Sequence, residues 1–278
     1  MKPKRSTCSH QQTGKNTPKI HIPVGPTTEK QVLPITDMLC WMIITVETTI
    51  GWPAIETSVT FAGETLLLRP QDGDSSADVR MQYAHPQNEH ATFELISRFL
   101  SCLSWWYHMP ARGDIRISST APMRGGGLRP GPPLVANFSI PSDLTIPTAV
   151  VDRLSLALYR EAASVNHLPF EFLGYFKVIN ASHNKSKDQI AWMNQALPQI
   201  SDSKALSRIA NLNANEPNVG KYLYGSGRCA VAHAFQAPVI DPDLSVDLYR
   251  LGDDLPVVRA LAEYLIEHDL GIKWNASR

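Results

Sequence analysis

The chain has 278 residues, of which 43% are hydrophobic and 19% are charged, and its formal net charge at pH 7 is zero. This length is sufficient for one large domain or two ordinary ones, each with a buried core. Zero net charge excludes a general electrostatic attraction to nucleic acid, so an RNA site would have to be local.

Residues 1–31 are predicted to form a disordered basic tail. Lysines and arginines recur there among Thr, Ser, Gln and Pro, and so polar a segment cannot bury a core. Solvated disorder is the favoured interpretation, with contact to RNA as the alternative. The longest apolar run, Met38 to Val46, is much shorter than the about 20 residues that cross a bilayer. Without a signal-peptide pattern, we expect a cytoplasmic protein that does not enter the membrane.

Residues 32–141 favour a small α+β module. Strand-like segments cover 40–49, 57–61, 65–69, 78–84 and 114–119, and Gly63 sits at the expected hairpin turn between the second and third. Residues 89–108 have the apolar spacing of a helix that ends in Trp105-Trp106-Tyr107. These aromatic residues are expected to anchor the core rather than to stack on bases.

Residues 145–278 are predicted to form an all-helical bundle, so the fold class is α+β with a helical second half. Helices are expected over about 151–166, from Pro169, from Ser186, over 204–211, and from a start between Val219 and Gly227. In the first of these, an apolar stripe is expected to line one face of the helix, formed by Val151, Leu154, Leu158 and Val165. A last helix would be capped by Asp253 or Asp254, with Pro256 in its first turn and Gly271 at its end.

No metal or cofactor site is predicted. The four cysteines are scattered without zinc-site spacing, so they are expected to be reduced thiols. The histidines lack paired metal spacing, and the aspartates between Asp241 and Asp254 lack the glycine and terminal glutamate of an EF-hand loop. Turn and cap roles explain these aspartates better than a cation site does.

The run Arg228-Cys229-Ala230-Val231-Ala232-His233 carries the candidate chemistry. Arginine offers a planar set of donors that fits a phosphate, and histidine exchanges a proton near neutral pH. Five residues on an ideal helix correspond to about 140° around its axis, so the two side chains do not share one face. They would converge if Arg228 lay in the first helical turn, or if a two-fold dimer brought His233 of one chain to Arg228 of the other.

A small-residue stripe of Gly227, Ala230 and Ala234 supports the dimer, because such a surface favours close packing of another helix. We therefore expect a homodimer across this helix. The alternatives are structural: His233 as a buried helix histidine, and Arg228 in an ion pair with Glu171 or with an aspartate of 241–254.

The Arg-x4-His run, followed by Ala234, resembles the motif of HEPN domains. The segments 159–162, 171–176, 239–243 and 253–259 are similar to the C-terminal half of MauJ-type methylamine-utilisation proteins. The resemblance covers roughly residues 148 to 272. It implies a HEPN-like helical bundle that dimerises across the motif.

In active HEPN proteins the resemblance implies RNA cleavage without a metal. The ribose 2′-hydroxyl attacks the adjacent phosphate and leaves a cyclic phosphate and a 5′-hydroxyl. His233 would move the proton, and Arg228 would hold the developing charge. Active members usually carry a polar residue after the arginine, where this chain has Cys229. The first function hypothesis is therefore a metal-independent endoribonuclease, or an RNA- or nucleotide-binding protein, that uses Arg228 and His233. The alternative function is a non-catalytic accessory protein of the MauJ-like type, which acts through a dimer or partner surface.

Overall fold

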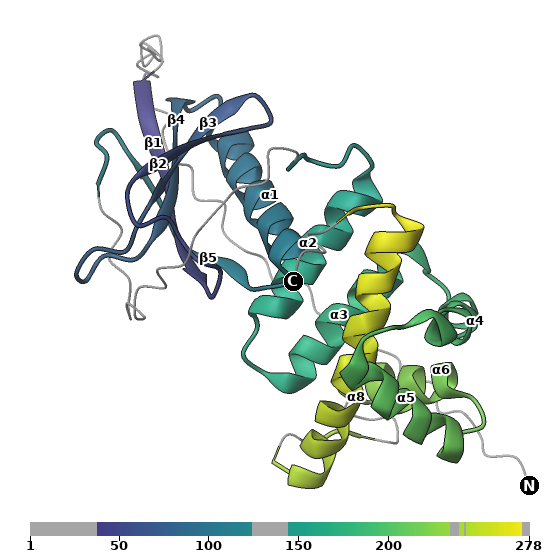
Figure 1. Ribbon diagram of the computed structural model, residues 1–278. Coiled ribbons are helices and arrows are strands. Elements are labelled where there is room, and N and C mark those ends of the chain that lie inside the picture. Colours follow the sequence, from purple (N-terminus) through teal and green to yellow (C-terminus); the bar gives the residue numbers. More distant parts are fainter. Residues whose placement is uncertain (1–37, 124–143, 234–238, 242, 274–278) are drawn as a thin grey trace, which may run out of the picture. The chain divides into compact units, whose positions relative to one another are not determined.

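The computed structural model describes residues 38–123, 144–233, 239–241 and 243–273 (Figure 1). These described residues make up one compact unit. The predicted basic tail and residues 124–143 lie outside the described residues. The prediction of separate domains over 32–141 and 145–278 stays a prediction.

The first described half is an antiparallel five-stranded sheet in the order β2-β3-β4-β1-β5. Its strands are β1 (Met38–Thr48), β2 (Thr57–Phe61), β3 (Glu64–Arg69), β4 (Asp78–His85) and β5 (Ala111–Ser119). All five fall where the sequence predicts them. The β2–β3 turn consists of Ala62 and Gly63, both with positive φ (52° and 83°), which is the geometry of a two-residue hairpin.

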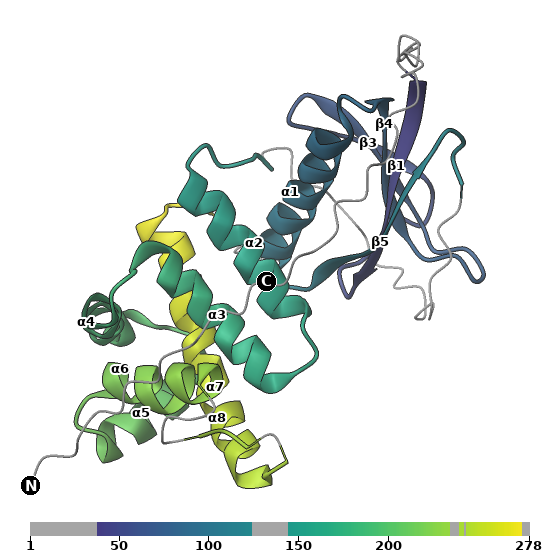
Figure 2. The same ribbon diagram turned by 180° about the vertical axis from the view of Figure 1, so that it is seen from behind.

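Helix α1 (Glu89–Tyr107) packs along one face of this sheet (Figures 1 and 2). Its Phe99 meets Phe61 of β2 edge to face, with 5.2 Å between the ring centroids. Trp105 is 2% exposed, so this aromatic residue anchors the core as expected. The helix ends at His108 in the left-handed conformation, a common C-terminal geometry.

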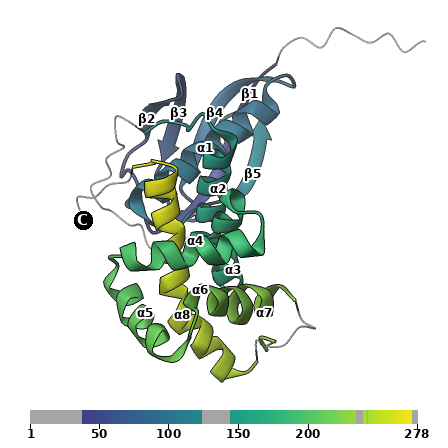
Figure 3. The same ribbon diagram turned by 90° about the vertical axis from the view of Figure 1, so that its right-hand side faces the viewer.

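The second half is helical, which confirms the α+β fold class. It begins with α2 (Val150–Ser164), α3 (Leu168–Ser182), α4 (Ser186–Ala196) and α5 (Ser203–Asn215). The long α8 (Ser245–Tyr264) packs against α3 and α5, and Figure 3 shows α4, α5 and α6 gathered around it. No helix within the described residues is long and apolar enough to cross a membrane.

The motif run lies on one helical stretch with an irregular middle. It starts with α6 (Val219–Tyr222), continues as a π-helical segment η2 (Leu223–Cys229) and ends with α7 (Ala230–Ala232). A second π-helical segment, η3 (Leu265–Asp269), extends α8, and Gly271 follows it with φ of +68°. Gly271 therefore ends the last helix as predicted.

Two predictions about the helices are wrong. The last helix starts at Ser245, not near Asp253, so Pro256 lies inside it and Asp254 is no cap. Asp254 is fully buried, and its partners on other helices hold this stretch in place across the proline. In α2 the buried face includes Tyr159 and Ala162; of the predicted stripe Leu158 packs against the core, whereas Leu154 is 45% exposed.

Candidate functional site

The Arg228 side chain lies beside an aromatic ring and a thiol. Its guanidinium carbon is 5.5 Å from the centre of the Tyr224 ring, a cation–π contact within one helical turn. Nη1 is 3.7 Å from the Cys229 sulfur, and Nε is buried without a hydrogen bond. No carboxylate of a described residue forms an ion pair with Arg228, so the predicted pairing with Glu171 or an aspartate of 241–254 is wrong for the described residues.

His233 ends the motif helix. Its backbone N–H donates to the carbonyl of Cys229 over 2.9 Å, and its own backbone is extended, with φ of −132°. The helical run begins nine residues before Arg228, so the arginine is not in a first turn with free backbone N–H groups. The first geometry that would bring the two side chains together is thereby excluded.

The small residues of the motif helix are used within the chain. A Cβ atom added to Gly227 would lie 2.4 Å from Cζ of Phe172 on α3, and Ala230 is 3% exposed. Ala234 lies outside the described residues. The premise that Gly227 and Ala230 present an open surface to a second chain is therefore wrong, and the homodimer itself stays a prediction.

A buried aspartate fixes the motif helix to its neighbours. Asp254 accepts a hydrogen bond from Nε of Arg208 (2.8 Å) and another from the Tyr222 hydroxyl (2.9 Å). Burial raises the pKa of Asp254, while the bonds from Arg208 and Tyr222 oppose that rise. One turn earlier on α8, Nη1 of Arg250 donates to the carbonyl of Ser226 (2.8 Å). The start of α8 and η2 are thus joined by polar contacts.

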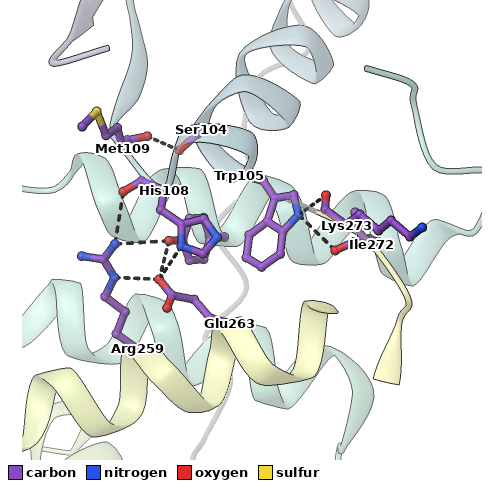
Figure 4. A network of polar contacts seen from close by, with 9 residues as sticks. Ser104, Trp105, His108, Met109, Arg259, Glu263, Ile272 and Lys273 are labelled. Carbon is purple, nitrogen blue, oxygen red and sulfur yellow. Dashed lines mark hydrogen bonds and ion pairs between the residues drawn. The ribbon is translucent and has the colours of Figure 1, made fainter. Parts of the chain in front are cut away.

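A second polar cluster, which the sequence analysis missed, lies between α1, α2 and α8 (Figure 4). Oε1 of Glu263 accepts bonds from the Tyr159 hydroxyl (2.7 Å) and from Nε of Arg259 (2.8 Å). His108 Nδ1 lies 3.4 Å from the same oxygen. Nη2 of Arg259 donates to the His108 carbonyl (3.1 Å), which holds this positive-φ residue in place. We call these four residues the Arg259 network.

Beside the Arg259 network, the end of α1 also contacts the segment that follows η3, residues 270–273. The Trp105 indole N–H, one turn before His108, donates to the carbonyls of Ile272 and Lys273 at 3.3 and 3.1 Å (Figure 4). The Ser104 hydroxyl donates to the Met109 carbonyl. The end of α1 is therefore fixed on two sides, by the arginine of α8 and by the segment after η3.

The charges of this cluster are set by burial and by neighbours. Burial raises the pKa of Tyr159 well above its ordinary value, so this hydroxyl stays protonated and donates to Glu263. Burial opposes the charge on Arg259, but Tyr159 and Glu263 outweigh it and raise its pKa. Arg259 is therefore a permanent cation, and its guanidinium lies 6.0 Å from the centre of the Tyr175 ring.

Three members of the network, His108, Arg259 and Glu263, line a pocket of about 590 Å³. The other lining residues come from α3, from the end of η1 (Leu197–Gln199) and the loop after it, from the start of α5, and from α8 and η3. Both signs of charge line it: Glu171, Asp202, Glu263 and Glu267 against Lys204 and Arg259. A sequence signal was present, because Arg259 and Glu263 are four residues apart and therefore share one face of α8, and Glu267 follows four residues later in η3.

No group of three or more histidine, cysteine, aspartate or glutamate side chains is arranged to hold a metal ion in the part of the chain that the structure describes. Cys40, Cys102 and Cys229 are free thiols, and burial raises the pKa of Cys102 to about 12.

Comparison with known proteins gives one match. No curated protein and no solved structure is significantly similar to the chain. Residues 155–267 match the family model described as Methylamine utilization protein MauJ. This range contains the motif run, the buried Asp254 and three members of the Arg259 network, whereas the sheet and α1 lie outside it. The helical part of the chain is thus similar to MauJ proteins.

Proposed function

We propose that the chain is a non-catalytic accessory protein of methylamine utilisation that acts through a partner surface on its helical half. The observation that carries the proposal is the match of residues 155–267 to the MauJ family. Every element from α3 to the end of α8 lies within this range, so the resemblance concerns a folded region and not one short motif.

The start of α8 offers a surface for a partner. Val246 and Tyr249, three residues apart on one helix face, are 68% and 75% exposed. Tyrosine is among the side chains that contribute most to protein interfaces. Arg250, the next residue, ties this helix end to the Ser226 carbonyl of η2, so the exposed pair sits on a fixed part of the fold.

A growth assay tests this proposal. A strain that lacks the gene should grow more slowly with methylamine as the only nitrogen source and normally with ammonium. The wild-type chain and Ile55→Ser should restore growth, because Ile55 is an equally exposed apolar residue (76%) in the sheet half. The double change Val246→Ser and Tyr249→Ser should not restore it at equal protein level. Equal growth of the deletion strain on both nitrogen sources would remove the methylamine role.

RNA cleavage by a HEPN-like Arg228–His233 pair is a second candidate. It is favoured by the Arg228 guanidinium, a permanent cation that no described carboxylate neutralises. In a monomer, Arg228 and His233 of the same chain would have to contact one phosphate. In the homodimer, His233 of each chain would act together with Arg228 of the other chain. Cys229, which lies against Arg228, supplies the weak hydrogen-bond group where active HEPN proteins carry a polar one.

The test is cleavage of total RNA in EDTA by the wild type, Arg228→Ala and His233→Ala. The second candidate requires activity in the wild type and its loss in both variants. Equal activity in all three proteins would assign the cleavage to a contaminant. No activity in any of them would remove the nuclease candidate, so that the accessory role would be the remaining proposal.

A further inference from the structure

We propose that the 590 Å³ pocket beside the Arg259 network binds a small zwitterion, an α-amino acid with an aliphatic side chain. The volume falls within the range of about 300–1,000 Å³ that is typical of small-molecule sites. The inference does not depend on the proposed function, because the pocket lies along α8 from Leu255 onward, whereas Val246 and Tyr249 lie in the first two turns of that helix.

One end of the proposed ligand is recognised by an unused donor. The Arg259 guanidinium donates one hydrogen bond from Nε to Glu263 and another from Nη2 to the His108 carbonyl. Its third nitrogen, Nη1, forms no hydrogen bond with a described residue, and Figure 4 shows it pointing away from the network. The side chain is 39% exposed. A carboxylate is the natural acceptor for such a fixed guanidinium edge, and Lys204 lines the same pocket as a second cation.

The other end is recognised by an unpaired carboxylate. Glu171, on α3, lines the pocket, is half-buried, and has no hydrogen bond or ion pair with a described residue. Burial raises its pKa, and the nearby charge of Arg259 opposes that rise. A half-buried carboxylate without a partner is costly, and a protonated amine would supply the missing donor.

The two recognition groups favour a ligand with both charges over a ligand with one. Arg259 is close enough to Glu171 to influence its pKa, yet their side chains do not form an ion pair. A simple amine at Glu171 would be repelled by Arg259, and a simple acid at Arg259 would be repelled by Glu171. An ammonium beside a carboxylate on one carbon atom satisfies both groups.

The remaining surface suits an aliphatic group. Ile200, Leu255, Pro256 and Ala260 line the pocket together with these charges. They come from two parts of the fold, since Ile200 follows η1 and the other three lie on α8. An aliphatic side chain of the ligand would remove their surface from water.

Isothermal titration with a matched set of compounds tests the proposal on the full chain. The probes are L-leucine, 3-methylbutylamine, which lacks the carboxylate, and 4-methylpentanoate, which lacks the amine. L-leucine should bind at least about tenfold more tightly than either, which is the loss expected for one charge-assisted hydrogen bond. Equal binding of leucine and the amine would overturn the zwitterion site, as would failure of leucine to bind at millimolar concentration.

Matched variants locate the binding. Glu171→Gln keeps the size of the side chain and should weaken leucine binding by at least about tenfold, while leaving binding of 4-methylpentanoate unchanged or stronger. Glu64→Gln removes an exposed carboxylate of β3 and should change neither. If Glu171→Gln and Glu64→Gln bind leucine equally well, the site is not in this pocket. Circular dichroism at the titration temperature confirms that each variant is folded.

Discussion

The sheet half and the helical half of this protein solve the burial of polar groups in different ways. In the sheet, a buried ion pair joins Asp78 and Arg80 on β4, within the regular β1–β4 ladder. The irregularity of the sheet lies elsewhere, where the β1–β5 register shifts between Ile44 and Val46. In the helical half, buried Asp254 and the α8 members of the Arg259 network lie beside irregular elements, namely a proline inside α8 and two π-helical segments. The network also includes His108, the positive-φ residue at the end of α1. Irregular helix geometry is often found at functional sites, and here it borders both candidate sites.

Replacement of Asp254 is expected to lower the free energy of unfolding more than any other change considered for the two halves. Asp254→Ala would leave the side chains of Arg208 and Tyr222 without their shared acceptor, and loss of one partner of a buried charged pair costs about 3–5 kcal/mol. The neighbouring Asp253 is exposed, so Asp253→Ala should stay within about 0.5 kcal/mol of the wild type. Urea unfolding measures both. Equal, small losses would mean that the helical half does not depend on its buried aspartate.

Gly227 tests whether the motif helix is as tightly packed as the geometry indicates. Gly227→Ala places a methyl group 2.4 Å from the Phe172 ring, so overpacking should cost about 1–3 kcal/mol. Gly225→Ala meets nothing within 4 Å and should be neutral or stabilise by up to about 1 kcal/mol, because alanine favours a helix. The two glycines are two residues apart, so a similar effect of both changes would contradict packing against α3.

In the sheet half, we expect a loss of stability when the β2–β3 turn is changed. Gly63 has φ of +83° and open space around its Cβ position, so Gly63→Ala costs backbone strain without a clash, about 1 kcal/mol. Thermal unfolding followed by circular dichroism would measure it. A loss as large as that of Asp254→Ala would show that the turn controls more of the fold than its own hairpin.

The sequence predicted the sheet half closely because each signal there is local. Alternation identifies the strands, and the turn at Gly63 needs glycine whatever lies around it. The start of α8 was missed because the sequence cannot show that Asp254 is bonded by Arg208, forty-six residues away. A proline after two aspartates is typical of a helix start, and tertiary contacts overrode that pattern.

In the candidate sites, too, the features that depend on local sequence were predicted, and those that depend on tertiary contacts were not. The motif run was placed correctly on a helix that starts at Val219, but the packing of Gly227 on Phe172 depends on α3 and was not visible. The Arg259 network joins residues from α1, α2 and α8, of which only the Arg259–Glu263 spacing is local. The sequence contains its members, and the fold alone brings them together.

Replacement of Glu171 is expected to have the smallest effect on the free energy of unfolding, and to raise it rather than lower it. Its folded pKa is raised by burial, so the native state holds its proton more tightly than the unfolded chain does. Its favourable contribution to stability is therefore complete below the unfolded pKa and is lost as pH rises through the folded pKa. Glu171→Gln removes a carboxylate that is costly at neutral pH, so the variant should be more stable than the wild type there, by well under about 1 kcal/mol because solvent screens a half-buried group.

The gain should shrink on acidification, because the wild-type carboxyl becomes neutral as well. Urea midpoints at neutral pH and at about pH 4 would measure this, with Glu64→Gln as the exposed control that changes little at either pH. Lower stability of Glu171→Gln at neutral pH would mean that this carboxylate stabilises the fold through a partner. A gain at neutral pH combined with weaker leucine binding would instead identify Glu171 as a residue that lowers stability and serves a ligand, as residues of binding sites often do.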